Sequence, residues 1–124
     1  MAKKILIVDD ERTIADTLSV IFRGLGYETF AAYNGLLGLD AARNIDPDLI
    51  LTDVFMPGMD GVQMAIEIRA TLPHIKVLLF SGQASTADLL QVAENLGFHF
   101  EVMQKPIRPE EIIRQVKQAL AKAA

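Results

Sequence analysis

Residues 49–61 read LILTDVFMPGMDG, an apolar run that ends on an aspartate and then enters a turn. The apolar run has the length and composition of a buried strand, and Pro57 and Gly58 are typical of a tight turn. The predicted strand, residues 48–52, is therefore followed directly by Asp53. A carboxylate at the end of a buried strand is held on a rigid support, which is typical of a group that does chemistry.

Three other strand-like segments of the chain also end on polar or charged groups. Asp9 and Asp10 follow the run at residues 5–8, and Ser81 follows the run at residues 77–80. Lys105 follows the mixed segment at residues 100–104. In parallel sheets, ligands bind outside the carboxyl ends of the strands, where the strand order reverses. We therefore expect these groups and Asp53 to meet at one edge of a sheet.

Short apolar segments alternate with amphipathic segments along the whole chain. Strands are expected at residues 5–8, 27–32, 48–52, 75–80 and 98–104. Helices are expected from about residue 14 to residue 25 and at residues 36–45, 62–72, 84–96 and 109–121. Because each parallel connection needs a crossover, this alternation predicts an α/β fold, a doubly wound five-stranded parallel sheet with helices on both faces. The unbroken runs at 5–8 and 77–80 suit central strands, and residues 27–32 suit an edge strand.

Length and composition restrict the class of protein. A chain of 124 residues has the size of one domain, here residues 1–124. Its apolar runs are shorter than the roughly 20 residues that cross a bilayer, and its start does not form a secretion signal. We expect a cytoplasmic protein with no membrane partner.

Charge and residue usage exclude further classes of site. A net charge of −4 disfavours general binding to nucleic acid, and the absence of cysteine excludes disulfides and thiolate sites. A metal ion must then be held by oxygen atoms or by His74 and His99. The two histidines lack partners at ligand spacing, so we assign them no function.

The expected cluster of Asp9, Asp10 and Asp53 favours a divalent cation. Three carboxylates in one place repel each other and raise at least one pKa unless a cation shares the site. Oxygen ligands with room for water fit Mg²⁺ best, with Ca²⁺ and Mn²⁺ as possible substitutes. Lys105 suits a phosphate beside that metal, and Ser81 can donate a hydrogen bond to a phosphoryl oxygen. Asp53 could itself be the nucleophile and form an acyl phosphate.

Each motif also has an ordinary structural interpretation. Asp9, Asp10 and Glu11 could only cap the first helix, and the Ser81-Gly82 and Lys105-Pro106 pairs could be a turn and a loop. Taken singly, these interpretations are at least as good as the functional ones. Independent caps and turns need not fall at the ends of four strands in consistent order, so their combination favours a single phosphoryl site.

Together these residues resemble the receiver domain of bacterial response regulators in two-component signalling. The resemblance covers the whole chain and rests on Val8-Asp9-Asp10-Glu11, residues 53–61, Ser81-Gly82 and Lys105-Pro106. It implies a CheY-like, flavodoxin-like (βα)₅ fold with strand order 2-1-3-4-5.

The resemblance also implies a role for each site residue. Asp53 would accept a phosphoryl group from a sensor histidine kinase or a histidine phosphotransfer protein. Mg²⁺ would be bound by Asp10, Asp53 and the backbone carbonyl of Phe55, with Asp9 acting through a water molecule. Ser81 and Lys105 would bond the phosphoryl oxygens. Water would slowly remove the phosphoryl group, so the protein would be a phosphorelay switch and not a metabolic enzyme.

Two departures from the family pattern affect the expected switch. The family usually places an aromatic residue where this chain has Val102. A bulge or a shifted register could let Phe100 take its place, since both positions share side-chain parity along a strand. The alternative is that Phe98 and Phe100 are ordinary core residues. Phe55 and Gln83 border the phosphorylation site, and the bulk of Phe55 is expected to slow hydrolysis.

Partners and competing functions follow from the same resemblance. A downstream effector protein would bind the surface of the fourth helix, fifth strand and fifth helix. Since only Lys122 to Ala124 follow the last helix, the chain either acts alone or was cut from a longer regulator. One alternative is a receiver-like scaffold that binds its partner without phosphorylation. An aspartate phosphatase or a flavodoxin-like cofactor protein is disfavoured, because Phe55 stands at the second Asp position and no glycine-rich loop follows the first strand.

Overall fold

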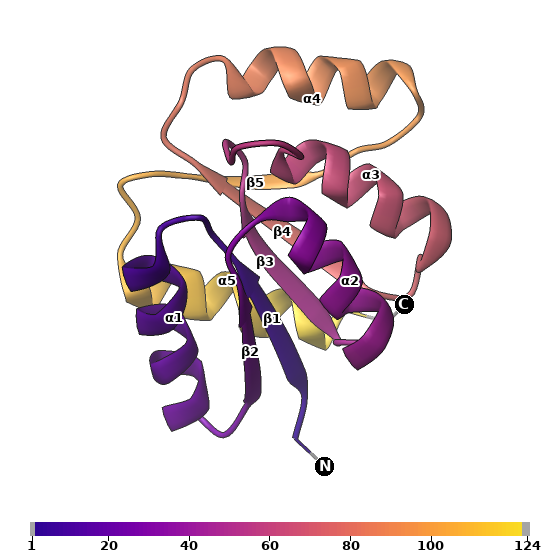
Figure 1. Ribbon diagram of the computed structural model, residues 1–124. Helices are drawn as coiled ribbons and strands as arrows, with labels where there is room; N and C mark the ends of the chain where they lie inside the picture. The colour runs from indigo at the N-terminus through magenta and orange to yellow at the C-terminus, as the bar shows by residue number, and fades with distance from the viewer. Residues whose placement is uncertain (1, 123–124) are drawn as a thin grey trace.

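The computed structural model describes residues 2–122, in which strands and helices alternate strictly (Figure 1). The strands are β1 (Lys4–Val8), β2 (Glu28–Ala32), β3 (Leu49–Asp53), β4 (Lys76–Ser81) and β5 (Glu101–Gln104). The helices are α1 (Arg12–Gly24), α2 (Gly35–Ile45), α3 (Gly61–Thr71), α4 (Thr86–Asn95) and α5 (Pro109–Ala121).

All five strands form one parallel sheet in the order β2-β1-β3-β4-β5, which confirms the predicted fold. β1 and β4 lie inside the sheet and β2 lies at its edge, as their composition predicted. From β1 the chain first adds β2 on one side and then crosses to place β3 on the other. The strand order therefore reverses between β1 and β3, and the carboxyl ends of these two strands carry the predicted aspartates.

Helices cover both faces of the sheet. α1 and α5 pack on one face against alternate residues such as Ile7, Leu51 and Phe80. α2 and α3 pack on the other face against the intervening residues, such as Leu6 and Ile50. In Figure 1 these two helix layers lie on opposite sides of the strands, and α4 extends along the top. Because β3 is buried over its whole length, the sheet is a rigid support for the group at its end.

The fifth strand is shorter than predicted. The expectation was residues 98–104, whereas β5 begins at Glu101. The backbone groups just before it are bonded elsewhere: the Phe98 amide donates to Ala93, and the His99 carbonyl accepts from Arg69. From Glu101 onward the ladder with β4 runs in one-to-one register, so the suggested bulge is absent from β5. The other boundaries differ from the predicted ones by about two residues or less, which is usual at element ends.

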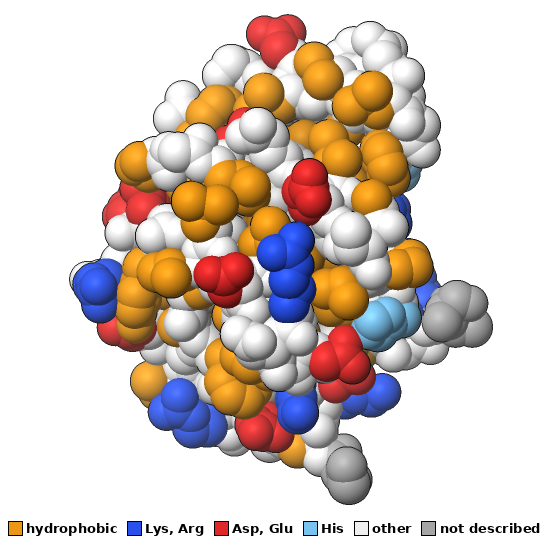
Figure 2. Space-filling view, turned by 45° about the vertical axis from the view of Figure 1, so that its right-hand side comes forward, with side chains coloured by type: hydrophobic (Ala, Val, Ile, Leu, Met, Phe, Trp, Pro, Cys, Tyr) orange, Lys and Arg blue, Asp and Glu red, His pale blue; other side chains and the backbone are white. Residues whose placement is uncertain are grey.

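The surface over α2, α3 and α4 mixes apolar side chains with charges of both signs (Figure 2). Apolar side chains gather in the upper part of this view, where α4 lies. Val92 and Leu96, at the C-terminal end of α4, are 55% and 62% exposed. Among the described residues, no helix is both long and apolar enough to cross a membrane.

Candidate functional site

The predicted polar groups meet at the carboxyl edge of the sheet. Asp53 is the last residue of β3 and Ser81 is the last residue of β4. Asp9 and Asp10 follow β1, and Lys105 follows β5. The amide of Lys105 donates to the carbonyl of Ser81 at 2.8 Å, which extends the β4–β5 pairing by one residue and fixes the start of the lysine side chain.

Three carboxylates form a tight cluster at this edge. One oxygen from each of Asp9, Asp10 and Asp53 lies within 4.8 Å of the others. Asp9 is fully buried, Asp53 is 7% exposed and Asp10 is exposed. The cluster therefore places negative charge in a largely buried position with one side open to solvent.

Burial changes the protonation of two of these groups. Loss of solvent raises the pKa of Asp9 from 3.8 to about 6, and the charges of Asp53 and Asp10 push it in the same direction. The hydrogen bond from the Glu11 amide and the charge of Lys105 oppose this rise. Burial also raises the pKa of Asp53, against the opposing effects of Lys105 and the Val54 amide. Both anions are thus less stable here than in water.

The cluster fits a divalent cation. The Asp9 Oδ1 atom accepts from the Glu11 amide at 2.9 Å, whereas its Oδ2 atom is buried and has no hydrogen-bond partner. A buried carboxylate oxygen without a partner costs free energy that a bound cation would recover. An all-oxygen donor set suits Mg²⁺. Asp9, Asp10 and Asp53 could hold the ion, and Phe55, whose carbonyl the family resemblance implied as a further ligand, follows in the turn after β3.

Lys105 supplies the positive charge of the site. Its Nζ atom lies 3.5 Å from Asp53 Oδ1 and 4.8 Å from the centre of the buried Phe80 ring. The lysine side chain is only 29% exposed, so its charge is screened less than that of a surface lysine. Lys105 therefore both stabilises the Asp53 carboxylate and stands beside any group attached to it.

The turn after Asp53 depends on the absence of a side chain at Gly61. A Cβ atom at Gly61 would lie 2.1 Å from the carbonyl oxygen of Asp53, a distance that no real contact shows. The Gly61 amide donates to Val54 at 2.7 Å, and Asp60 and Gln63 form a capping box at the start of α3. The chain can therefore enter α3 immediately behind the Asp53 carboxylate, and the residues between them form a closed turn.

Ser81 lies at the site but is bonded away from the carboxylates. Its Oγ atom is 2.6 Å from the Thr86 Oγ1 atom and accepts from the Gln83 amide at 3.2 Å. None of the hydrogen bonds found among residues 2–122 joins Ser81 to Asp53. Thr86 was not predicted from the sequence, because it is a single threonine inside a predicted helix. Only the packed structure brings it to Ser81.

The two residues predicted for the switch lie in different surroundings. Val102 borders a cleft of about 150 Å³ that Ser81 and Thr86 also line. Phe100 is 5% exposed and lies before β5, where its ring stacks on Phe98 and contacts the Arg69 guanidinium. Phe100 does not line the cleft beside Ser81, and it packs in the core on the α2 and α3 face.

Capping of the first helix, the ordinary interpretation of Asp9, Asp10 and Glu11, explains little of their geometry. Glu11 is the N-cap residue of α1, and its side chain makes no capping hydrogen bond. Asp9 instead accepts from the Glu11 amide through Oδ1, while its Oδ2 atom is buried without a partner. His74 and His99 pair with Asp46 and Glu94 on the surface and are not part of the cluster.

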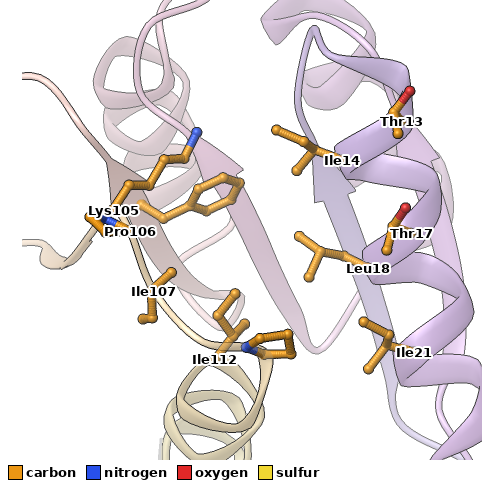
Figure 3. A pocket seen from close by; sticks show the side chains of 11 residues that line it. Thr13, Ile14, Thr17, Leu18, Ile21, Lys105, Pro106, Ile107 and Ile112 are labelled. Carbon is orange, nitrogen blue, oxygen red and sulfur yellow. The ribbon is translucent and has the colours of Figure 1, made fainter.

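An apolar groove lies beside Lys105, between α1 and the segment that connects β5 to α5 (Figure 3). Its volume is about 580 Å³. Figure 3 shows the side chains of Ile14, Leu18 and Ile21 facing Ile107 and Ile112 across the groove. The sequence analysis did not identify this groove, because its two walls are more than eighty residues apart in the chain.

Comparison with known proteins gives consistent matches over nearly the whole chain. The model of the family described as the response regulator receiver domain matches residues 5–117. Sporulation initiation phosphotransferase F of Bacillus subtilis (strain 168) is 38% identical over 122 residues, which cover 97% of this chain and 95% of that protein. The DNA-binding response regulator MtrA of Mycobacterium tuberculosis (strain ATCC 25618 / H37Rv) is 30% identical over 120 residues. That alignment covers 97% of this chain and 51% of MtrA, so the chain spans about half the length of this relative.

Solved structures agree with the sequence matches. A CheY-like response regulator receiver domain protein from Methanospirillum hungatei JF-1 superposes with a TM-score of 0.88 at 29% identity, covering 97% of this chain and 94% of the other. The chemotaxis response regulator CheY4 of Vibrio cholerae gives a TM-score of 0.83 at 26% identity, covering 96% and 99%.

Replacement of Asp9 by Asn should stabilise the protein in buffer without divalent cations. Because the folded pKa of Asp9 lies above the unfolded value, its contribution to stability is greatest below pH 4 and is lost as the pH rises through about 6. The neutral amide avoids this loss, so the free energy of unfolding at pH 7.5 should rise by about 1–3 kcal/mol. Urea unfolding at pH 4 and pH 7.5 measures the change.

The matched control is Asp10→Asn, which alters the exposed member of the cluster and should give a smaller gain. Added Mg²⁺ should stabilise the wild type more than Asp9→Asn. If Asp9→Asn were less stable than the wild type at pH 7.5 without Mg²⁺, the electrostatic account would be contradicted.

Proposed function

This chain belongs to the response regulator receiver domain family of two-component signalling, and on that premise we propose that it is a phosphorelay switch whose phosphoryl acceptor is Asp53. One observation carries the proposal. The Asp53 carboxylate lies at the end of a fully buried strand, within a cluster of three carboxylates and 3.5 Å from the Lys105 ammonium. Sporulation initiation phosphotransferase F, which matches along nearly its whole length, is named for the same type of chemistry.

In the proposed reaction, a carboxylate oxygen of Asp53 attacks the phosphorus atom of a phosphohistidine. A P–O bond forms, the P–N bond breaks, and the imidazole leaves with the bonding electrons and takes up a proton. Lys105 lies where it can pair with an oxygen of the transferred group. Mg²⁺, when bound by the cluster, would neutralise charge on the other phosphoryl oxygens. Asp9 and Asp10 would hold the ion, together with the carbonyl of Phe55.

The phosphoryl group would later be lost to water. Attack of water on phosphorus breaks the P–O bond, releases inorganic phosphate and regenerates the Asp53 carboxylate. Phe55, two residues after Asp53, is only partly exposed and packs against the core on the α2 and α3 face. We propose that its ring restricts the approach of water. The protein would then control the lifetime of its own phosphoryl group without acting as an enzyme on other substrates.

The phosphodonor would dock in the groove between α1 and the β5–α5 segment. A sensor histidine kinase or a histidine phosphotransfer protein must bring its histidine to Asp53 while excluding water. The groove ends at Lys105, so a partner that fills it also borders the acceptor site. Its walls are mainly apolar, which suits the apolar face of a partner helix.

A downstream effector would bind the surface of α4, β5 and α5. β5 is an edge strand of the sheet, and Val92 in α4 and Leu96 just after it are large exposed apolar side chains. Large exposed apolar side chains that cluster in this way are typical of protein interfaces. α4 and β5 do not line the groove, whereas the start of α5, at Pro109 and Ile112, belongs to both surfaces, so an effector and a phosphodonor would compete only there.

Incubation with acetyl phosphate and Mg²⁺ should add one phosphoryl group to the wild type. Asp53→Asn should abolish the added mass, because the amide cannot form the acyl phosphate. Asp60→Asn, at the other aspartate of the same turn, is the control and should be phosphorylated normally. Intact-protein mass spectrometry measures both. A wild type that gains no mass would instead favour the scaffold that works without phosphorylation.

Phe55→Ala should shorten the lifetime of phosphorylated Asp53. Removing the ring opens the approach of water, and hydrolysis should accelerate several-fold, on the order of 1 kcal/mol of barrier. The decay can be followed by phosphate release after the excess donor is removed. Phe98→Ala removes a partly buried ring elsewhere and should leave the decay unchanged. Equal decay of Phe55→Ala and the wild type would refute the shielding role.

Ile14→Glu should weaken phosphoryl transfer from a kinase but not from acetyl phosphate. A charge in the apolar groove costs docking energy, so we expect kcat/KM for transfer to fall about tenfold or more. The donor is a phosphorylated histidine kinase selected from a panel by its transfer to the wild type. Val20→Glu is the control, because Val20 lies on the same helix, is 62% exposed and does not line the groove. Equal losses in both variants would argue against docking in the groove.

A further inference from the structure

Thr86 makes a side-chain contact with the site that the sequence did not predict. Its Oγ1 atom lies 2.6 Å from the Ser81 Oγ atom, and both residues are buried, at 6% and 3% exposure. We infer that Thr86 is a positioning residue, which holds the Ser81 hydroxyl away from Asp53 and couples its release to the first turn of α4. This inference rests on the proposed phosphorylation of Asp53.

The hydroxyl of Ser81 is fully engaged in the structure. It accepts a hydrogen bond from the Gln83 amide at 3.2 Å, and its remaining short contact is with Thr86. To bond a phosphoryl oxygen on Asp53, Ser81 must rotate its side chain, which takes the Oγ atom away from Thr86. The Ser81 hydroxyl can therefore bond either Thr86 or the phosphoryl group, and the two hydrogen bonds compete.

Loss of this bond acts directly on α4. Thr86 is the first residue of that helix, and Thr86 and Ala93 are its only buried residues. Ser85, the N-cap residue, makes no side-chain capping bond, so no other side chain holds the helix start in that way. The helix is thus held at its N-terminal end by a polar contact to the site and near its C-terminal end by packing.

The structure leaves space for the helix start to respond. A cleft of about 150 Å³ adjoins the two hydroxyls and is bordered by Val102 and Leu90. Once Ser81 leaves, the Thr86 hydroxyl is buried without a partner, which is unfavourable. A small movement of the first turn of α4 into or along the cleft would return the hydroxyl to water. The Ser81–Thr86 bond would thereby connect the state of Asp53 to the effector surface without an aromatic residue at position 102.

The test compares Thr86→Val, which keeps the shape and removes the hydroxyl, with the wild type. Hydrogen exchange is measured at the Ala87 and Asp88 amides, which bond to Ala84 and Ser85 in the first turn of α4. In the wild type, beryllium fluoride with Mg²⁺, a mimic of the phosphoryl group, should accelerate this exchange about fivefold, the ratio expected for one net hydrogen bond. Thr86→Val should exchange about fivefold faster without the mimic, and the mimic should add little.

Affinity for beryllium fluoride provides a second measurement. If Thr86 were only structural, its replacement would not make the mimic bind more tightly. Because Ser81 no longer has a competing partner, Thr86→Val should bind beryllium fluoride up to about fivefold more tightly, as measured by ¹⁹F NMR. Thr86→Ser restores the hydroxyl and should behave as the wild type. Ser85→Ala is the matched neighbour, and it should also behave as the wild type because Ser85 makes no capping bond.

Unchanged exchange in Thr86→Val without the mimic, or unchanged or weaker binding of the mimic, would overturn the inference. Failure of the proposed function would look different. The wild type would then bind no beryllium fluoride, whereas hydrogen exchange of Thr86→Val and the wild type without the mimic would still test the Ser81–Thr86 contact. If Thr86→Val does not fold, as judged by circular dichroism, Thr86→Ala takes its place with the same expected directions.

Discussion

The concentration of negative charge at the end of a buried strand is the constraint on which this structure depends. Asp9 and Asp53 are buried at the point where the strand order reverses, and Asp10 stands beside them at the surface. Burial raises the pKa of both buried groups, and among residues 2–122 Lys105 is the one cation close enough to pair with Asp53. The fold maintains an arrangement that is costly in itself, and a bound cation would offset that cost. Such costs are typical of functional sites, where stability is given up for chemistry.

Much of this arrangement could be predicted from the sequence. The alternation of apolar strands with amphipathic helices predicted the parallel sheet, and the polar residues at the ends of four strands predicted which groups would meet. Both signals are local, since they depend on spacing along the chain. The position of Asp53 was predictable for the same reason, because the apolar run before it and the turn after it are contiguous in sequence.

Features that depend on packing between distant segments were not predictable. The length of β5 depends on where Phe98 and His99 find hydrogen-bond partners, and those partners lie in α4 and α3. The contact of Thr86 with Ser81 depends on how α4 starts after a loop, which no periodic pattern specifies. The groove beside Lys105 joins α1 to the segment before α5. Each of these features depends on tertiary contacts between segments that are distant in the chain, and no local sequence pattern indicates such contacts.

A Mg²⁺ titration by calorimetry between pH 5 and pH 8 tests the central claim most directly. If the buried carboxylates form the cation site, one ion should bind per protein, and its affinity should fall as the pH drops through about 6, because protons then compete for Asp9. Absence of binding, or an affinity that does not change over this range, would contradict the account.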